Sequence, residues 1–154
     1  MHFKKYSKEN YFLTINDTNS SEELSKILYD WSIGKNADTF YKFYAYLNEN
    51  SCKNESMPFL DKDLLFSIDA IRLKEINGEK ILKQKAQVVV EIYLDSIIPP
   101  KLQIDIDQDM LYKLLKAANN ITTTQNIYAK SNLAIFNEAM TILFKKLLPY
   151  WGKN

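Results

Sequence analysis

The pair Asn77-Gly78 constrains the fold of this chain more than any other local feature. It separates two runs rich in apolar residues, roughly residues 64–76 and 79–95, and Asn-Gly is the preferred pair for the type I′ turn of a β-hairpin. Every second residue of the later run is apolar, as in a strand with one face on the core: Val88, Val90, Ile92 and Leu94. The sequence therefore predicts an antiparallel hairpin around Asn77-Gly78.

Other segments favour further strands. Residues 11–16 and 102–106 are short apolar runs, and the second alternates apolar with polar positions. Residues 39–47 fit either a strand or a helix, and their aromatic enrichment favours the strand. As a helix, this segment would place four large side chains on one face: Phe40, Phe43, Tyr44 and Leu47.

Capping residues and apolar spacing predict three helices. Ser20 and Glu23 have the spacing of a capping box, and Gly34 is a suitable stop for the helix that follows. Asp107 is placed to cap a second helix, and Ser131 to cap a third.

These elements together predict an α+β fold formed by a single domain, residues 1–154. We expect an antiparallel β-sheet of about four to five strands, including the Asn77-Gly78 hairpin, packed against about three helices on one face. The chain has no linker-like stretch and no internal repeat that would divide it.

Charge and cysteine content limit the classes of partner. Lys and Arg total 20 against 19 for Asp and Glu, a net charge of +1, and Arg72 is the only arginine. This balance gives no reason to expect binding to nucleic acid or to a membrane. The single cysteine, Cys52, cannot form an internal disulfide, so we expect a cytoplasmic protein.

The residues needed for proton transfer are scarce. The only histidine is His2, next to the chain start, and no phosphate-binding or nucleophile motif occurs. We therefore expect no cofactor, and we favour a protein without catalytic activity over an enzyme.

One acidic cluster keeps an enzymatic alternative open. Asp105, Asp107 and Asp109 alternate along the chain, and paired carboxylates of this kind hold Mg²⁺ in phosphoryl-transfer, nucleotidyl-transfer and phosphodiesterase enzymes. The competing interpretation is that Asp107 caps a helix and Asp109 interacts with its positive end.

Aromatic residues supply the favoured functional prediction. We predict a protein-binding module, such as a small inhibitor, immunity or adaptor protein that blocks a partner's surface, because Tyr and Trp anchor protein interfaces. The predicted contact residues are Tyr41, Tyr44, Tyr46, Tyr150 and Trp151. Acidic side chains, among them Asp61 and Asp63, would meet a basic partner. A small-ligand-binding domain lined by Tyr and Phe is the second alternative.

Overall fold

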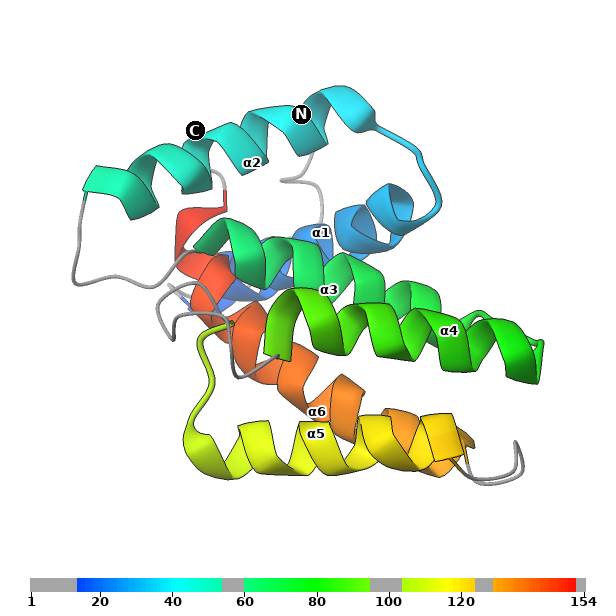
Figure 1. Ribbon diagram of the computed structural model, residues 1–154. Coiled ribbons are helices and arrows are strands. Elements are labelled where there is room, and N and C mark those ends of the chain that lie inside the picture. Colours follow the sequence, from blue (N-terminus) through cyan, green and yellow to red (C-terminus); the bar gives the residue numbers. More distant parts are fainter. Residues whose placement is uncertain (1–13, 54–59, 95–103, 124–128, 152–154) are drawn as a thin grey trace.

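The protein is built from α-helices. The computed structural model describes residues 14–53, 60–94, 104–123 and 129–151, and no β-strand occurs within these ranges. A π-helical turn, η2 (Val90–Leu94), continues α4, and a 3₁₀ turn, η5 (Leu148–Tyr150), follows α6. The helices are α1 (Thr14–Ser32), α2 (Ala37–Lys53), α3 (Leu60–Lys74), α4 (Glu79–Val89), α5 (Gln108–Thr123) and α6 (Ala129–Leu147) (Figure 1).

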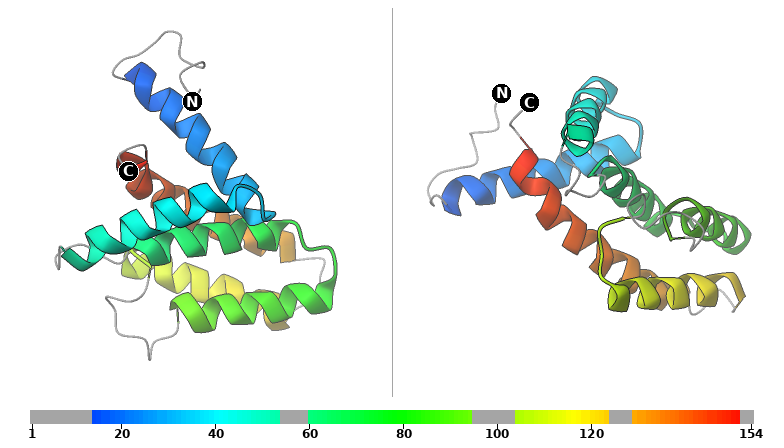
Figure 2. Two further views of the ribbon diagram at one scale, coloured as in Figure 1. Left: turned by 90° about the horizontal axis from the view of Figure 1, so that it is seen from above. Right: turned by 60° about the vertical axis from the view of Figure 1, so that its left-hand side comes forward.

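Four of the helices pack around a common centre. Helix α3 contacts α4 and α6, and α5 contacts the same two helices, so that α3, α4, α5 and α6 close a ring. Helices α1 and α2 pack against α3 from outside this ring. Figure 2 shows α1 extending away from the other helices toward the N-terminus.

Helix α3 contributes to two hydrophobic cores. The first core fills the four-helix ring and includes Phe66 of α3 and Phe136 of α6. The second core lies between α1, α2, α3 and the end of α6, and includes Phe43, Leu64 and Leu147. Because α3 packs on both, most of its circumference is buried.

The predicted α+β fold, with its sheet and its Asn77-Gly78 hairpin, is wrong. The two predicted hairpin arms are helices α3 and α4 with η2. A type I′ turn needs positive φ at both central residues, but Gly78 has φ −88° and ψ 132° and precedes the first turn of α4. The buried positions of the second arm follow helical spacing: Leu82, Ala86, Val89 and Tyr93.

The remaining predicted strands are also wrong wherever the structure describes them. Residues 39–47 lie in α2, and residues 14–16 belong to α1. Residues 104–106 form a turn before α5, whereas residues 11–13, 102 and 103 lie outside the described residues. The helical alternative for residues 39–47 is the one observed, with Phe43 and Leu47 fully buried.

Helix ends follow the predictions in part. Gly34 ends α1 and Asp107 caps α5, as predicted. The predicted starts at Ser20 and Ser131 are wrong, because both residues lie inside longer helices that begin at Thr14 and Ala129. A serine is tolerated within a helix when packing further along stabilises the helix, so it marks a start only weakly.

Candidate functional site

The turn between α1 and α2 has a defined geometry. Gly34 adopts φ 81°, its N–H donates to the carbonyl of Trp31 at 3.0 Å, and the N–H of Lys35 donates to the carbonyl of Asp30 at 2.8 Å. These two bonds form a Schellman motif, which requires a left-handed residue that glycine supplies without strain. Asn36 also adopts positive φ, and its side-chain Nδ2 donates to Oδ2 of the Asp30 carboxylate at 3.0 Å. The turn is therefore held by backbone and side-chain bonds.

The indole of Trp31 is fixed against this turn. Its Nε1 donates to the carbonyl of Asn36 at 3.0 Å and contacts Thr39 Oγ1 at 3.1 Å. The ring meets Phe40 edge-on at a centroid distance of 5.6 Å and lies 6.1 Å from Phe43. A buried tryptophan whose N–H is hydrogen-bonded in this way is held in one position, so its ring presents a fixed apolar surface to neighbouring groups.

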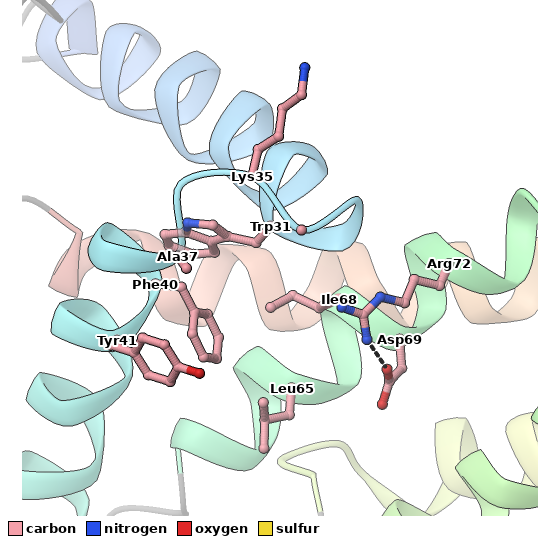
Figure 3. A pocket seen from close by; sticks show the side chains of 10 residues that line it. Trp31, Lys35, Ala37, Phe40, Tyr41, Leu65, Ile68, Asp69 and Arg72 are labelled. Atoms are coloured by element: carbon pink, nitrogen blue, oxygen red, sulfur yellow. Dashed lines mark hydrogen bonds and ion pairs between the residues drawn. The ribbon is translucent and has the colours of Figure 1, made fainter.

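A cavity of about 300 Å³ opens beside Trp31, between the α1–α2 turn, α2 and α3. Figure 3 shows Phe40 and Tyr41 projecting from α2 on one side, and Leu65 and Ile68 of α3 on the other. Tyr41 is 65% exposed although it lines the cavity. The complete lining is Trp31, Gly34, Lys35, Ala37, Phe40, Tyr41, Leu65, Ile68, Asp69 and Arg72.

A polar network forms one end of the cavity. Arg72 Nη1 lies 3.2 Å from Asp69 Oδ1, and Arg72 Nε donates to the carbonyl of Ser32 at 2.9 Å. The hydroxyl of Tyr93 donates to Asp69 Oδ2 at 2.6 Å. Burial and then this hydrogen bond to Asp69 raise the pKa of Tyr93, so its hydroxyl stays protonated. The only arginine of the chain thus joins the last turn of α1 to α3.

The aromatic residues predicted on α2 differ in their exposure. Tyr41 is the exposed one, whereas Tyr44 and Tyr46 are half-buried and pack against the second core. Tyr44 stacks on Phe40 at a centroid distance of 5.8 Å. Burial and the charge of Asp61 raise the pKa of the Tyr44 hydroxyl. Only Tyr41 of these three lines the cavity.

Tyr150 and Trp151, predicted to bind the same partner, belong mainly to the second core. Both are half-buried and pack against it at the end of α6. The Trp151 ring lies 5.2 Å from Phe43 and 6.0 Å from Trp31, edge-on in both cases. The structure therefore does not gather the five predicted residues into one exposed patch.

The three aspartates of the alternative metal site have separate roles. Asp105 Oδ2 pairs with Lys146 Nζ at 2.8 Å, and Asp107 Oδ1 accepts the N–H of Met110 at 2.8 Å as the cap of α5. The Asp109 side chain is 78% exposed and lies 3.5 Å from Lys113 Nζ. Across the ranges that the structure describes, no three His, Cys, Asp or Glu side chains are grouped so that they could hold a metal ion.

Two acidic residues expected at the surface are buried instead, so that expectation is wrong. Asp63 is fully buried, and its Oδ1 accepts the N–H of Asp105 at 2.9 Å. Asp61 Oδ2 accepts from the Asn48 amide at 3.1 Å. Burial raises the pKa of Asp63 to about 7, against the opposing effects of the Asp105 N–H and the charge of Lys146. This carboxyl group joins α3 to the turn that precedes α5.

The sequence interpretation missed the α3 side of the cavity. Leu65, Ile68, Asp69 and Arg72 have the i, i+3, i+4, i+7 spacing of one helix face. That signal was present, but the predicted strand over residues 64–76 would have divided these residues between two faces of a sheet.

Comparison with protein families, with curated proteins and with solved structures finds no match for this chain. Among the described residues, no helix is both long and apolar enough to cross a membrane.

Proposed function

We propose that this chain is a non-catalytic protein-binding module that contacts its partner through the outer surface of α2 and the adjoining cavity. The observation that carries the proposal is the placement of Tyr41, a 65% exposed aromatic residue beside an apolar cavity. Protein interfaces combine exposed Tyr, Trp and Arg anchors with pockets that receive a partner's side chain.

The rigid setting of this surface supports the proposal. The Schellman turn and the bonded Trp31 indole hold one wall of the cavity, while the bonds of Arg72 hold its polar end. A surface already ordered in its binding conformation loses less entropy on association. An inhibitor, immunity or adaptor protein would use such a surface to cover a functional surface of its partner.

We also propose a cytoplasmic location, because the single cysteine cannot form an internal disulfide and so needs no oxidising compartment.

Small-ligand binding is a second candidate function, favoured by the cavity itself. A volume of about 300 Å³ is at the lower end of the range typical of ligand sites. Saturable binding of a small metabolite, with no protein partner at Tyr41, would favour this candidate. The metal-dependent alternative has no comparable support, because Asp105 and Asp107 hold Lys146 and the first turn of α5.

Site-specific crosslinking tests the protein-binding proposal. A photoreactive phenylalanine analogue would replace Tyr41 in cells that make this protein, and the same analogue would replace Tyr112 on α5 in the control. Tyr112 is also 65% exposed but does not line the cavity. We expect a discrete protein adduct from position 41 that excess unmodified protein suppresses, and none from position 112. The same adducts from both positions, or none from position 41, would reject the proposal.

A further inference from the structure

We propose that the cavity beside α2 accepts a large apolar side chain from a partner protein segment that carries a carboxylate next to that side chain. This inference rests on the proposed protein-binding function, and it specifies the chemistry of the segment that is bound.

The apolar part of the occupant follows from the walls of the cavity. Trp31, Phe40, Leu65 and Ile68 present aromatic and aliphatic surfaces to the same space (Figure 3). Burying an apolar side chain there would remove both surfaces from water, which is the main favourable term in association. Tyr41 stands at the edge, where its exposed ring would contact the backbone that carries the inserted side chain.

The carboxylate follows from the hydrogen-bond donors of Arg72. The charged residues of the lining are Lys35, Arg72 and Asp69, and Arg72 and Asp69 form an ion pair at its polar end. Both oxygens of Asp69 already accept hydrogen bonds, one from Arg72 and one from Tyr93. The Arg72 side chain remains 53% exposed and its guanidinium lies at the cavity, whereas the Lys35 amine points away from it (Figure 3). A guanidinium carries five N–H donors, and the bonds to Ser32 and Asp69 use two of them. A carboxylate, which can accept two such bonds side by side, is therefore the complementary group at the Arg72 end.

Peptide selection tests this chemistry directly. A displayed library of random heptapeptides would be selected against the wild-type protein and against Ala37→Phe, which places a ring over the cavity from an exposed position at the start of α2. The matched control is Ala134→Phe, at an exposed α6 position that lines a different surface hollow. Circular dichroism would confirm that each variant is folded.

We expect selected peptides to share a large apolar residue within two positions of Asp or Glu. A synthetic consensus peptide should bind Ala37→Phe at least about tenfold more weakly than the wild type, and Ala134→Phe with unchanged affinity. Folded Arg72→Met should still select the apolar residue but lose the acidic preference. If Arg72→Met does not fold, replacing the acidic residue of the consensus peptide by its amide should weaken binding to the wild-type protein.

Three results would overturn the inference. These are a consensus without an acidic residue, equal binding of the consensus peptide to wild type and Ala37→Phe, and the absence of any enrichment. Saturable binding of 3-phenylpropionate without peptide enrichment would assign the cavity to a small carboxylate. The crosslinking result at Tyr41 does not depend on the peptide consensus. A protein crosslinked at Tyr41, together with selected peptides that share a basic residue instead of an acidic one, would reject this inference and leave the protein-binding proposal intact.

Discussion

Replacing Asp63 by Asn should change how the stability of the protein depends on pH. Asp63 is fully buried on α3, and no described residue forms a hydrogen bond to its Oδ2. The charged groups around it are Asp61 on the same helix, Asp105 before α5 and Lys146 on α6. Asparagine keeps the oxygen that accepts the Asp105 N–H and cannot ionise, so it imitates the protonated acid.

The size of the effect follows from the pKa of Asp63. Burial raises it from 3.8 to about 7, so the folded protein retains a proton that the unfolded chain has released between these two values. The stabilisation from this group is complete below pH 3.8 and is lost as the pH rises through 7. A difference of about 3 pH units at about 1.4 kcal/mol per unit corresponds to roughly 4 kcal/mol in the free energy of unfolding.

Urea unfolding followed by circular dichroism at pH 4, 5, 6, 7 and 8 measures this effect. The free energy of unfolding of Asp63→Asn, minus that of the wild type, should rise by about 1.4 kcal/mol per pH unit near pH 5, by about half as much per unit near pH 7, and level off at higher pH. If the new amide destabilises the protein by an amount that does not depend on pH, this amount shifts the whole curve and leaves its slope against pH unchanged. Asp109→Asn, at a largely exposed position on α5, is the control and should follow the wild-type curve. Parallel curves for Asp63→Asn and the wild type would refute the assignment of a raised pKa to this carboxyl group.

Two further predictions test the α1–α2 turn and the acidic cluster. Gly34→Ala should destabilise the protein by about 1 kcal/mol in urea unfolding, because an added Cβ meets no atom within 4 Å and only the left-handed φ of 81° is strained. Gly78→Ala, where φ is −88°, should be close to neutral, and equal losses at both positions would contradict the strain argument. Adding Mg²⁺ or Mn²⁺ should leave the melting temperature unchanged, because Asp105 and Asp107 already have the roles described above. A metal-dependent rise that Asp105→Asn abolishes would restore the metal site.

Two helix ends could be predicted from single residues, although the helix starts predicted at Ser20 and Ser131 were wrong. Gly34 ends α1 because a Schellman motif needs a residue that adopts positive φ without strain. Asp107 caps α5 because its side chain can accept a free N–H of the first turn. Neither signal depends on what packs against the helix, so both could be predicted from the sequence.

The predicted sheet failed because α3 is buried on two sides. Leu64 and Ile68 lie in the second core, while Phe66 and Ala70 lie in the first. A helix that fills two cores places apolar residues on opposite faces, so residues 64–76 form a run rich in apolar residues without a single apolar stripe. The alternation of Val88, Val90, Ile92 and Leu94 has a different origin, because Val88 and Ile92 are exposed apolar residues on the outer side of α4 and η2. The pair Asn77-Gly78 strengthened the error, although Gly78 has ordinary extended geometry. The spacing of apolar residues along the chain does not specify which face of a helix packs against which core, because that depends on tertiary contacts.

The candidate site was predictable only on its α2 side. Tyr41 was proposed as a contact residue because it belongs to an aromatic cluster, but the favoured strand would place it on the same face as Phe43 and Leu47. Its exposure agrees with the helical alternative, which leaves Tyr41 outside the buried face. The cavity also needs the α1–α2 turn to bring Trp31 beside α3, a contact between segments far apart in sequence. No local pattern predicts that approach.

The double burial of α3 has a consequence for how this sequence can diverge. Ten of the fifteen residues of α3 are buried. An ordinary amphipathic helix can vary along its solvent-exposed face, but α3 has few positions of that kind. In a saturation mutagenesis screen, α3 should tolerate polar replacements mainly at its few solvent-facing positions, whereas α4 should tolerate them along its whole outer stripe, including Ile81 and Val88. Among divergent copies of this protein, α3 would therefore be the segment whose sequence drifts most slowly.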